Sequence, residues 1–279
     1  MKRFILDGVG GIAENLIAAA IGGGLATGWR LIRKRTSSKD VRAMWAPFLT
    51  EPSCIVEGIL SPRLLCESFP DSVSPRHRDV ALSLLPDLER YVGEQEASGL
   101  MGKGDHEAIV RIQAGLARVG LRATLPVRSD HELGEHRLDN LIVVGGPDVN
   151  VVTKDLLTRL RCELVISRGE HDRNVVEDLR HGIHYSTKYD NSHLQDYGII
   201  VKAPSPYQSG KVVVIVAGAY GHGCIAAGHL AVTAVKELSD YGRRYSRGFE
   251  CVVSHRRTGE TSSPIEENSI LFAREIHSS

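Results

Sequence analysis

The sequence predicts an α/β fold of the Rossmann-like kind: a mostly parallel sheet with helices on both faces, plus a hydrophobic helix at the N-terminus. Three observations lead to this prediction. Strand-like and helix-like runs alternate along the 279 residues. Two glycine-rich turns each follow an apolar strand and precede a helix. Small and apolar residues fill the chain from Gly8 to Trp29.

The N-terminal run is long enough to cross a bilayer, since crossing takes about 20 mostly apolar residues. Gly8 to Trp29 contains one charged residue, Glu14. The basic residues that follow the run are Arg30, Arg33, Lys34, Arg35, Lys39 and Arg42. Because basic flanks stay on the cytoplasmic side, we expect a single-pass membrane protein whose soluble part is cytoplasmic and whose basic flank contacts anionic lipid. A helix lying in the membrane interface and a cleaved signal peptide are the alternatives.

This interpretation divides the chain into a membrane helix with its basic flank (1–35), a linker (36–50) and a cytosolic α/β domain (51–279). Within the first segment Ala18, Gly22 and Ala26 recur at every fourth position. Small residues at that spacing let two helices approach closely in lipid. This spacing predicts homo-oligomers that form through the N-terminal helix; the alternative is that glycine and alanine are simply common in membrane helices.

The composition excludes several classes of function. Acidic and basic residues balance at 34 each, so the chain has no overall charge that would attract nucleic acid, and we expect no nucleic-acid partner. The five cysteines are scattered and form no CxxC pair. We read them as reduced thiols, and neither a disulfide framework nor a zinc site is expected.

The first half of the α/β domain contains two predicted strands. The first covers 53–60 and the second lies near 121–127. Between them, apolar residues at helical spacing predict helices from Val80 to Val92 and from Asp105 to Val119. Asp105 is a suitable N-cap, and Gly120 would end the second helix.

The second half continues the alternation. The continuous apolar run at 141–144 is typical of a strand buried on both faces. The remaining predicted elements are helix 151–160, strand 162–167, a small strand at 183–188, strands 197–202 and 211–216 joined by a turn, helix 223–238, and strands 249–254 and 270–276.

The predicted ligand site lies at the two glycine-rich turns. Both turns would lie at the carboxyl ends of strands, where open α/β sheets bind ligands, and the N–H groups of the following helices favour an anion. The expected ligand-binding residues are Gly145, Gly146, Asp148, Asn150, Gly218, Gly221, His222 and Gly223. The alternative for each turn is a structural one, in which the glycines turn the chain and Asn150 caps a helix.

The dinucleotide fingerprint is nearly present at the second turn. Gly221, Gly223 and Ala226 satisfy GxGxxA. However, Gly218-Ala-Tyr separates the strand from this motif, and no acidic residue ends a following strand about 20 residues later, where it would bind a ribose. We therefore expect neither a nicotinamide nor a flavin cofactor.

Four residues are candidates for catalysis, namely Asp148, Asp196, His222 and Cys224. The thiol would lie near the positive end of a helix, where its pKa can fall, although a buried packing role is the alternative. The string from His131 to His136 contains histidines five residues apart and matches no zinc-protease motif, so no metal site is expected there.

The GGPxxN turn, the strand that begins at Asp196-Tyr-Gly and the AGxxGxGxxAA turn resemble a domain of bacterial membrane-anchored proteins of unknown function. They also resemble, more distantly, a segment of archaeal surface-layer proteins. The similarity covers residues 139–235, but Cys224 replaces the threonine expected after the last glycine. The resemblance implies a Rossmann-like fold and no particular reaction.

These observations lead to one leading functional hypothesis. It is a membrane-anchored cytosolic sensor that binds a nucleotide or other phosphorylated small molecule across the two turns, with a role in signalling. The alternatives are a nucleotide-processing hydrolase or glycosidase, and a structural or interaction module without a ligand.

Overall fold

A computed structural model describes residues 40, 44–58, 102–121, 124–169, 174–189, 193–258 and 265–276. The predicted N-terminal helix and its oligomer interface, the linker up to residue 39, and the predicted helix at 80–92 lie outside the described residues.

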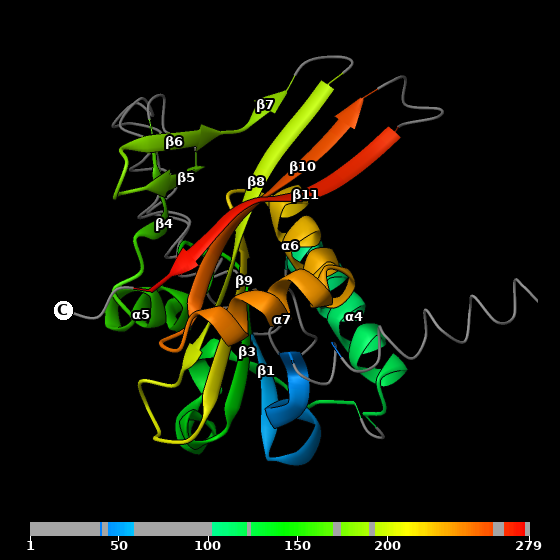
Figure 1. Cartoon of the computed structure of the whole chain (residues 1–279), viewed down its shortest axis with the longest axis vertical. Coiled ribbons are helices and arrows are strands. Elements are labelled where there is room, and N and C mark those ends of the chain that lie inside the picture. The colour runs from blue at the N-terminus through cyan, green and yellow to red at the C-terminus, as the bar shows by residue number, and fades with distance from the viewer. Residues whose placement is uncertain are drawn as a thin grey trace, which may run out of the picture.

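The main sheet has eight strands among the described residues, in the order β11-β10-β8-β9-β3-β1-β2, with β7 paired to β8 (Figure 1). The strands are β1 (Ser53–Glu57), β2 (Val127–Ser129), β3 (Asn140–Val144), β7 (Lys188–Tyr189), β8 (His193–Pro204), β9 (Val212–Gly218), β10 (Phe249–Thr258) and β11 (Ile265–Glu275).

The prediction of a mostly parallel, Rossmann-like sheet is wrong. Only the pairs β1–β2, β1–β3 and β3–β9 are parallel, whereas β7–β8, β8–β9, β8–β10 and β10–β11 are antiparallel. The physical reason is the length of the connections. A parallel pair needs a long crossover, but the turn between β8 and β9 covers only 205–211, which restricts these strands to a hairpin.

A second, antiparallel sheet follows the first helix after β3, where a Rossmann-like alternation would place another crossover. Its strands are β4 (Leu164–Arg168), β5 (Asn174–Asp178) and β6 (Ile183–Ser186), in the order β4-β5-β6. We call this three-stranded unit the small sheet. The chain returns from it to the main sheet through β7 and β8.

Each face of the main sheet carries its own hydrophobic cluster. Helices α4 (Lys103–Arg118), α6 (Gly221–Thr233) and α7 (Val235–Arg244) cover one face, on which Ile55, Val144 and Val216 are buried (Figure 1). Helix α5 (Val151–Arg159) and the small sheet cover the other face, against Val143 and Ile215. The predicted helix at 223–238 is two helices that meet at Ala234.

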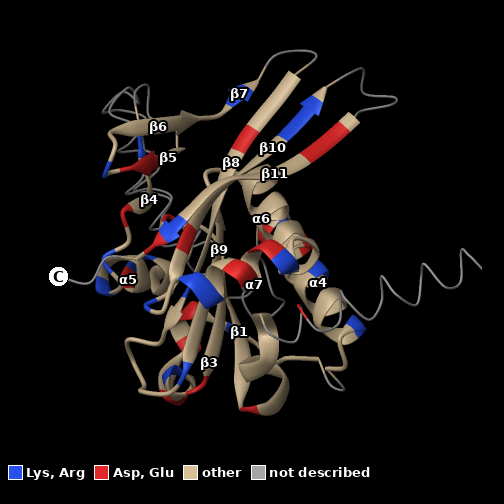
Figure 2. Cartoon of the chain, viewed as in Figure 1, with Lys and Arg blue, Asp and Glu red and all other residues tan. Residues whose placement is uncertain are grey.

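Basic residues on β10 lie beside acidic residues on β11, the two long strands at the top of Figure 2. Across β10 and β11, Arg256 lies opposite Glu267 and Arg257 lies opposite Glu266. Opposite charges on neighbouring strands therefore offset one another there.

The predicted membrane span and membrane localisation are corrected. Among the residues that the structure describes, no helix has both the length and the apolar character needed to cross a bilayer. The segment on which that prediction rested is itself outside the described residues.

Candidate functional site

The two glycine-rich turns lie side by side at the carboxyl edge of the parallel strands. The N–H of Gly145 donates to the carbonyl of Val216, 3.0 Å away, and this bond joins the ends of β3 and β9. A Cβ placed on Gly146 would lie 3.3 Å from the carbonyl oxygen of Gly218. The predicted ligand-binding glycines therefore occupy one edge of the sheet.

Close packing explains the glycines of the second turn. A Cβ on Gly223 would lie 2.0 Å from the carbonyl oxygen of Tyr197, and one on Gly218 would lie 2.1 Å from the backbone nitrogen of Cys224. Both positions exclude any side chain, because α6 packs directly on β8. These glycines thus have a structural role whether or not the turn binds a ligand.

The N-terminus of α5 is satisfied by the protein itself. Asn150 caps the helix as predicted, since its Oδ1 accepts from the N–H groups of Val152 and Thr153 at 3.0 and 3.2 Å. The N–H of Val151 donates to Oδ2 of Asp130 at 2.9 Å. The first three N–H groups of α5 are therefore not free to hold an anion.

The N-terminus of α6 also has an internal carboxylate. Oδ2 of the buried Asp196 accepts from the N–H of Gly223 at 2.6 Å. Its Oδ1 accepts from the Thr187 hydroxyl at 2.9 Å and from the N–H of Tyr197 at 2.8 Å. Asp196 thus acts as a structural cap, and its negative charge opposes a phosphate bound at the same turn.

The candidate nucleophile Cys224 is buried and next to an acid. Its side chain is in the core, with 1% of the residue exposed. Burial raises the pKa of the Cys224 thiol, and the neighbouring Asp105 raises it further. Burial likewise raises the pKa of Asp105, which the thiol contacts. Because the reactive form is the thiolate, this environment favours a packing role for Cys224.

His222 stacks on a second histidine that the sequence did not single out. The ring centroids of His222 and His255 are 5.0 Å apart. Burial and His255 both lower the pKa of His222, which favours its neutral form. His255 lies opposite Asp196 on the neighbouring strand and is held by Oδ1 of Asn268 at 2.9 Å. The structure therefore brings Asp196, His222 and Cys224 to the same edge as Asp148.

The residue that connects the two turns is Asn174, the first residue of β5. Its Nδ2 donates to Oδ2 of Asp148 in the first turn at 3.0 Å and to the carbonyl of Ala219 in the second at 3.2 Å. Its backbone N–H donates to the Tyr220 hydroxyl at 3.1 Å. Sequence reasoning missed Asn174, because nothing in its polar surroundings distinguishes it from a solvated loop residue.

A cavity of about 290 Å³ opens beside Asn174, between the first turn, α5 and the small sheet. We call it the Asn174 cavity. Lys154 and Arg168 line it, together with the exposed Asp148. The side chains of Lys154 and Arg168 are both exposed. The cavity thus combines two available cations with a carboxylate that Asn174 already orients.

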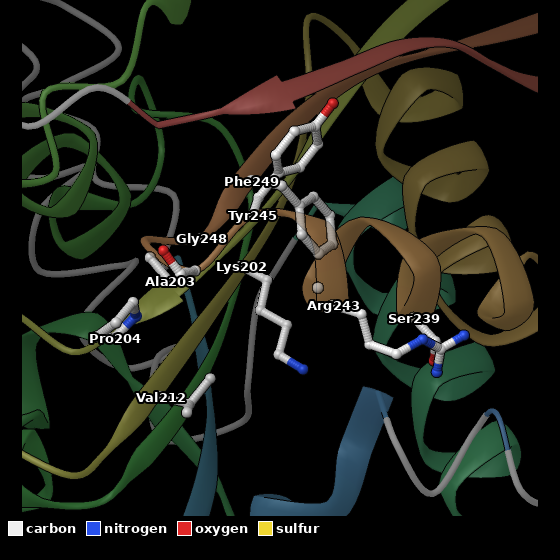
Figure 3. Close-up of a pocket in the computed structure, with 11 residues that line it drawn as sticks. Lys202, Ala203, Pro204, Val212, Ser239, Arg243, Tyr245, Gly248 and Phe249 are labelled. Atoms are coloured by element: carbon white, nitrogen blue, oxygen red, sulfur yellow. The ribbon is translucent and has the colours of Figure 1, made fainter.

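A second cavity, of about 210 Å³, lies at the other end of β8 and β9. Figure 3 shows Lys202 reaching from β8 into the space beside Arg243 and Ser239 of α7. Its Nζ donates to the carbonyl of Met44 at 2.6 Å, and burial lowers the pKa of Lys202 to about 8. This hydrogen bond joins the helical segment at 44–50 to β8 of the main sheet.

Comparisons with known proteins do not add an activity. No family model matches this chain, and no curated protein matches it. The predicted nucleotide ligand and signalling role find no support from relatives. The resemblance to membrane-anchored and surface-layer proteins stays a prediction.

Proposed function

We propose that this protein binds a small phosphorylated molecule that also carries hydroxyl groups, and that it does so in the Asn174 cavity. The observation that carries the proposal is the position of Asn174, which ties both glycine-rich turns together at the rim of a cavity lined by Lys154 and Arg168. A volume of about 290 Å³ suits a molecule of the size of a sugar phosphate.

The two ends of such a ligand have separate partners in the cavity. Arg168 and Lys154 supply the charge-assisted donors that phosphate oxygens accept. Asp148 is an acceptor for a ligand hydroxyl, and Asn174 fixes one of its oxygens in place. This arrangement differs from the sequence-based hypothesis, in which the helix N-termini hold the anion, because Asn150, Asp130 and Asp196 already occupy those N–H groups.

A hydrolase at the same edge is the second candidate. Asp105, whose pKa burial raises, is suited to donate a proton. Two observations argue against a hydrolase. Cys224 is buried, and both carboxylate oxygens of Asp196 already accept hydrogen bonds from the protein. A binding role needs neither residue as a reactive group, and we therefore favour it over catalysis.

The test is calorimetric titration of the full chain with inorganic phosphate, a set of hexose phosphates and the matching free hexoses. We expect a hexose phosphate to bind more tightly than either phosphate or hexose alone. Arg168→Gln and Lys154→Gln should each weaken binding about 10-fold, since each removes a charge-assisted hydrogen bond.

The matched control is Lys236→Gln, an exposed lysine on α7 over the opposite face of the sheet. This variant should bind like the unaltered protein. No heat of binding with any of these compounds would contradict the proposal and favour an interaction module without a ligand. Release of phosphate during the titration would favour the hydrolase.

A further inference from the structure

A group of three potential metal ligands lies at the amino edge of the parallel strands. Cys54 is the second residue of β1 and is fully buried. Asp139 comes just before β3, which pairs with β1 so that Asn140 lies opposite Ser53. His136 belongs to the short 3₁₀ helix η2 (Gly134–Leu138), which follows η1 (Asp130–Glu132). The fold thus brings a thiol, an imidazole and a carboxylate together.

The distances within this group are short. One ligand atom of each side chain lies within 4.8 Å of one ligand atom of the other two. Nδ1 of His136 and Oδ2 of Asp139 are 3.1 Å apart. A tetrahedral zinc ion with bonds of about 2.0 to 2.3 Å holds its ligand atoms roughly 3.3 to 3.6 Å apart. Small side-chain adjustments are therefore enough to place all three atoms around one ion.

We propose that Cys54, His136 and Asp139 bind a zinc ion through three protein ligands, with the fourth position open to water. Thiolate and imidazole are ligands that zinc prefers, and a carboxylate completes many zinc sites. Among the described residues, no other group of three cysteine, histidine or acidic side chains has ligand atoms that all lie within 4.8 Å of one another. The sequence analysis expected no metal site in the segment at 131–136, and this proposal differs from that expectation.

The Cys54 thiol carries a proton that a metal ion would have to displace. Burial raises the pKa of Cys54 to about 11, and Asp139 contributes to the rise. The free thiol is therefore protonated at neutral pH and unreactive. A zinc ion displaces this proton and forms the zinc–sulfur bond, so binding releases one proton from Cys54 to solvent.

An ion at this place would fasten η2 to the sheet. No residue of η2 is buried, so few apolar contacts hold it. The same connection begins at Asp130, which caps α5 at the opposite edge of the sheet. The zinc site and the Asn174 cavity therefore lie at different edges, and the zinc proposal does not depend on the proposed function.

The experiment is a titration of the full chain with Co²⁺ in place of zinc, followed by absorbance. Cobalt bound by a thiolate gives a charge-transfer band in the near ultraviolet, and we expect one equivalent to produce it. The band should be absent in Cys54→Ser. In His136→Asn and Asp139→Asn, which keep the thiol, the affinity for Co²⁺ should fall at least 10-fold. Zinc should displace the cobalt and raise the melting temperature of the unaltered protein.

The matched control is His131→Asn, which removes an exposed histidine of the same connection. It should bind Co²⁺ like the unaltered protein. The proposal is overturned if no charge-transfer band forms, if the band survives in Cys54→Ser, or if His131→Asn lowers the affinity as much as His136→Asn does. Because His136 and Asp139 are partly exposed, those two variants should remain folded.

Discussion

Beside its apolar packing, the small sheet has two polar attachments to the rest of the molecule, and they differ in chemistry. At one, the nearly buried Arg274 of β11 donates to Asp178 of β5 at 2.7 Å and to Glu250 of β10 at 2.6 Å. Glu250 in turn accepts from the N–H groups of Glu163 and Leu164. At the other, the neutral amide of Asn174 bonds to the two glycine-rich turns beside an open cavity.

The first attachment is suited to hold the small sheet in one position, and the second is suited to adjust when a ligand binds. Removing one partner from a buried charged group leaves the others without compensation, which is costly. A partly exposed amide loses less, because water replaces its bonds. The Arg274 cluster is therefore suited to fixing the small sheet in place, whereas the Asn174 end can adjust when a ligand enters.

The largest expected effect follows from Arg274→Met. It leaves Asp178 and Glu250 buried without their cation, and we expect a loss of about 3 to 5 kcal/mol in the free energy of unfolding. Urea denaturation measures the loss. As a control, Arg243→Met breaks the exposed pair with Asp240 and should change stability by no more than about 1 kcal/mol. An equal loss of stability in both variants would show that the buried Arg274 does not fix the small sheet more firmly than an exposed ion pair would.

An intermediate and pH-dependent effect is expected for Asp178→Asn. Burial alone would raise the pKa of Asp178, but hydrogen bonds from His181 and Arg274 outweigh it and lower the pKa below that of a free aspartate. The stabilisation from its charge is thus fully present at pH values well above the pKa of an unfolded aspartate, and it is lost as the pH falls through the lowered pKa of the folded protein.

Unfolding of both proteins at neutral pH and near pH 3 tests this dependence. The variant should be less stable by about 2 kcal/mol at neutral pH, and the difference should shrink in acid. A difference that stays constant over this range would show that the charge of Asp178 is not what holds the attachment.

The smallest effect on stability is expected for Asn174→Ala, at about 1 kcal/mol. Its main consequence should be faster amide hydrogen exchange at positions 219–220 and 174, and weaker binding of the phosphorylated ligand. The comparison fails if this substitution destabilises the protein as strongly as Arg274→Met, or if exchange at the turns stays unchanged.

Local patterns predicted β1, β3 and β9 close to their observed bounds, but the strand predicted near 121–127 overlaps β2 (Val127–Ser129) only at Val127. The apolar run at 141–144 forms a strand buried on both faces, and Asn150 caps the helix that follows. The start of α4 was less accurate: its N-cap is Gly102, and Asp105 lies in the first turn. Gly104 lies against Gly221 of α6, where a Cβ would be 2.4 Å from the Cα of Gly221, so the two helix ends meet without room for a side chain.

The candidate site was predicted only in part. The sequence identified the glycine-rich turns and the four acidic, imidazole and thiol candidates, which do gather at one edge of the sheet. It could not identify Asn174 or Asp130, because their hydrogen-bond partners are more than 20 residues away in the chain. Nor could spacing along the chain suggest Cys54 with His136 and Asp139, since their proximity comes from the pairing of β1 with β3.

The sequence by itself determined many of the strands and helices, though not β2 or β5, as well as where the glycine-rich turns fall and which helix Asn150 caps. It could do so because hydrophobic periodicity and capping are local properties. Only the tertiary structure decided that half of the sheet is antiparallel, that the helix N-termini are closed by Asp130 and Asp196, and that Asn174 joins the two turns. Those outcomes depend on strand pairing and burial between distant segments, and no local pattern encodes which distant groups will meet.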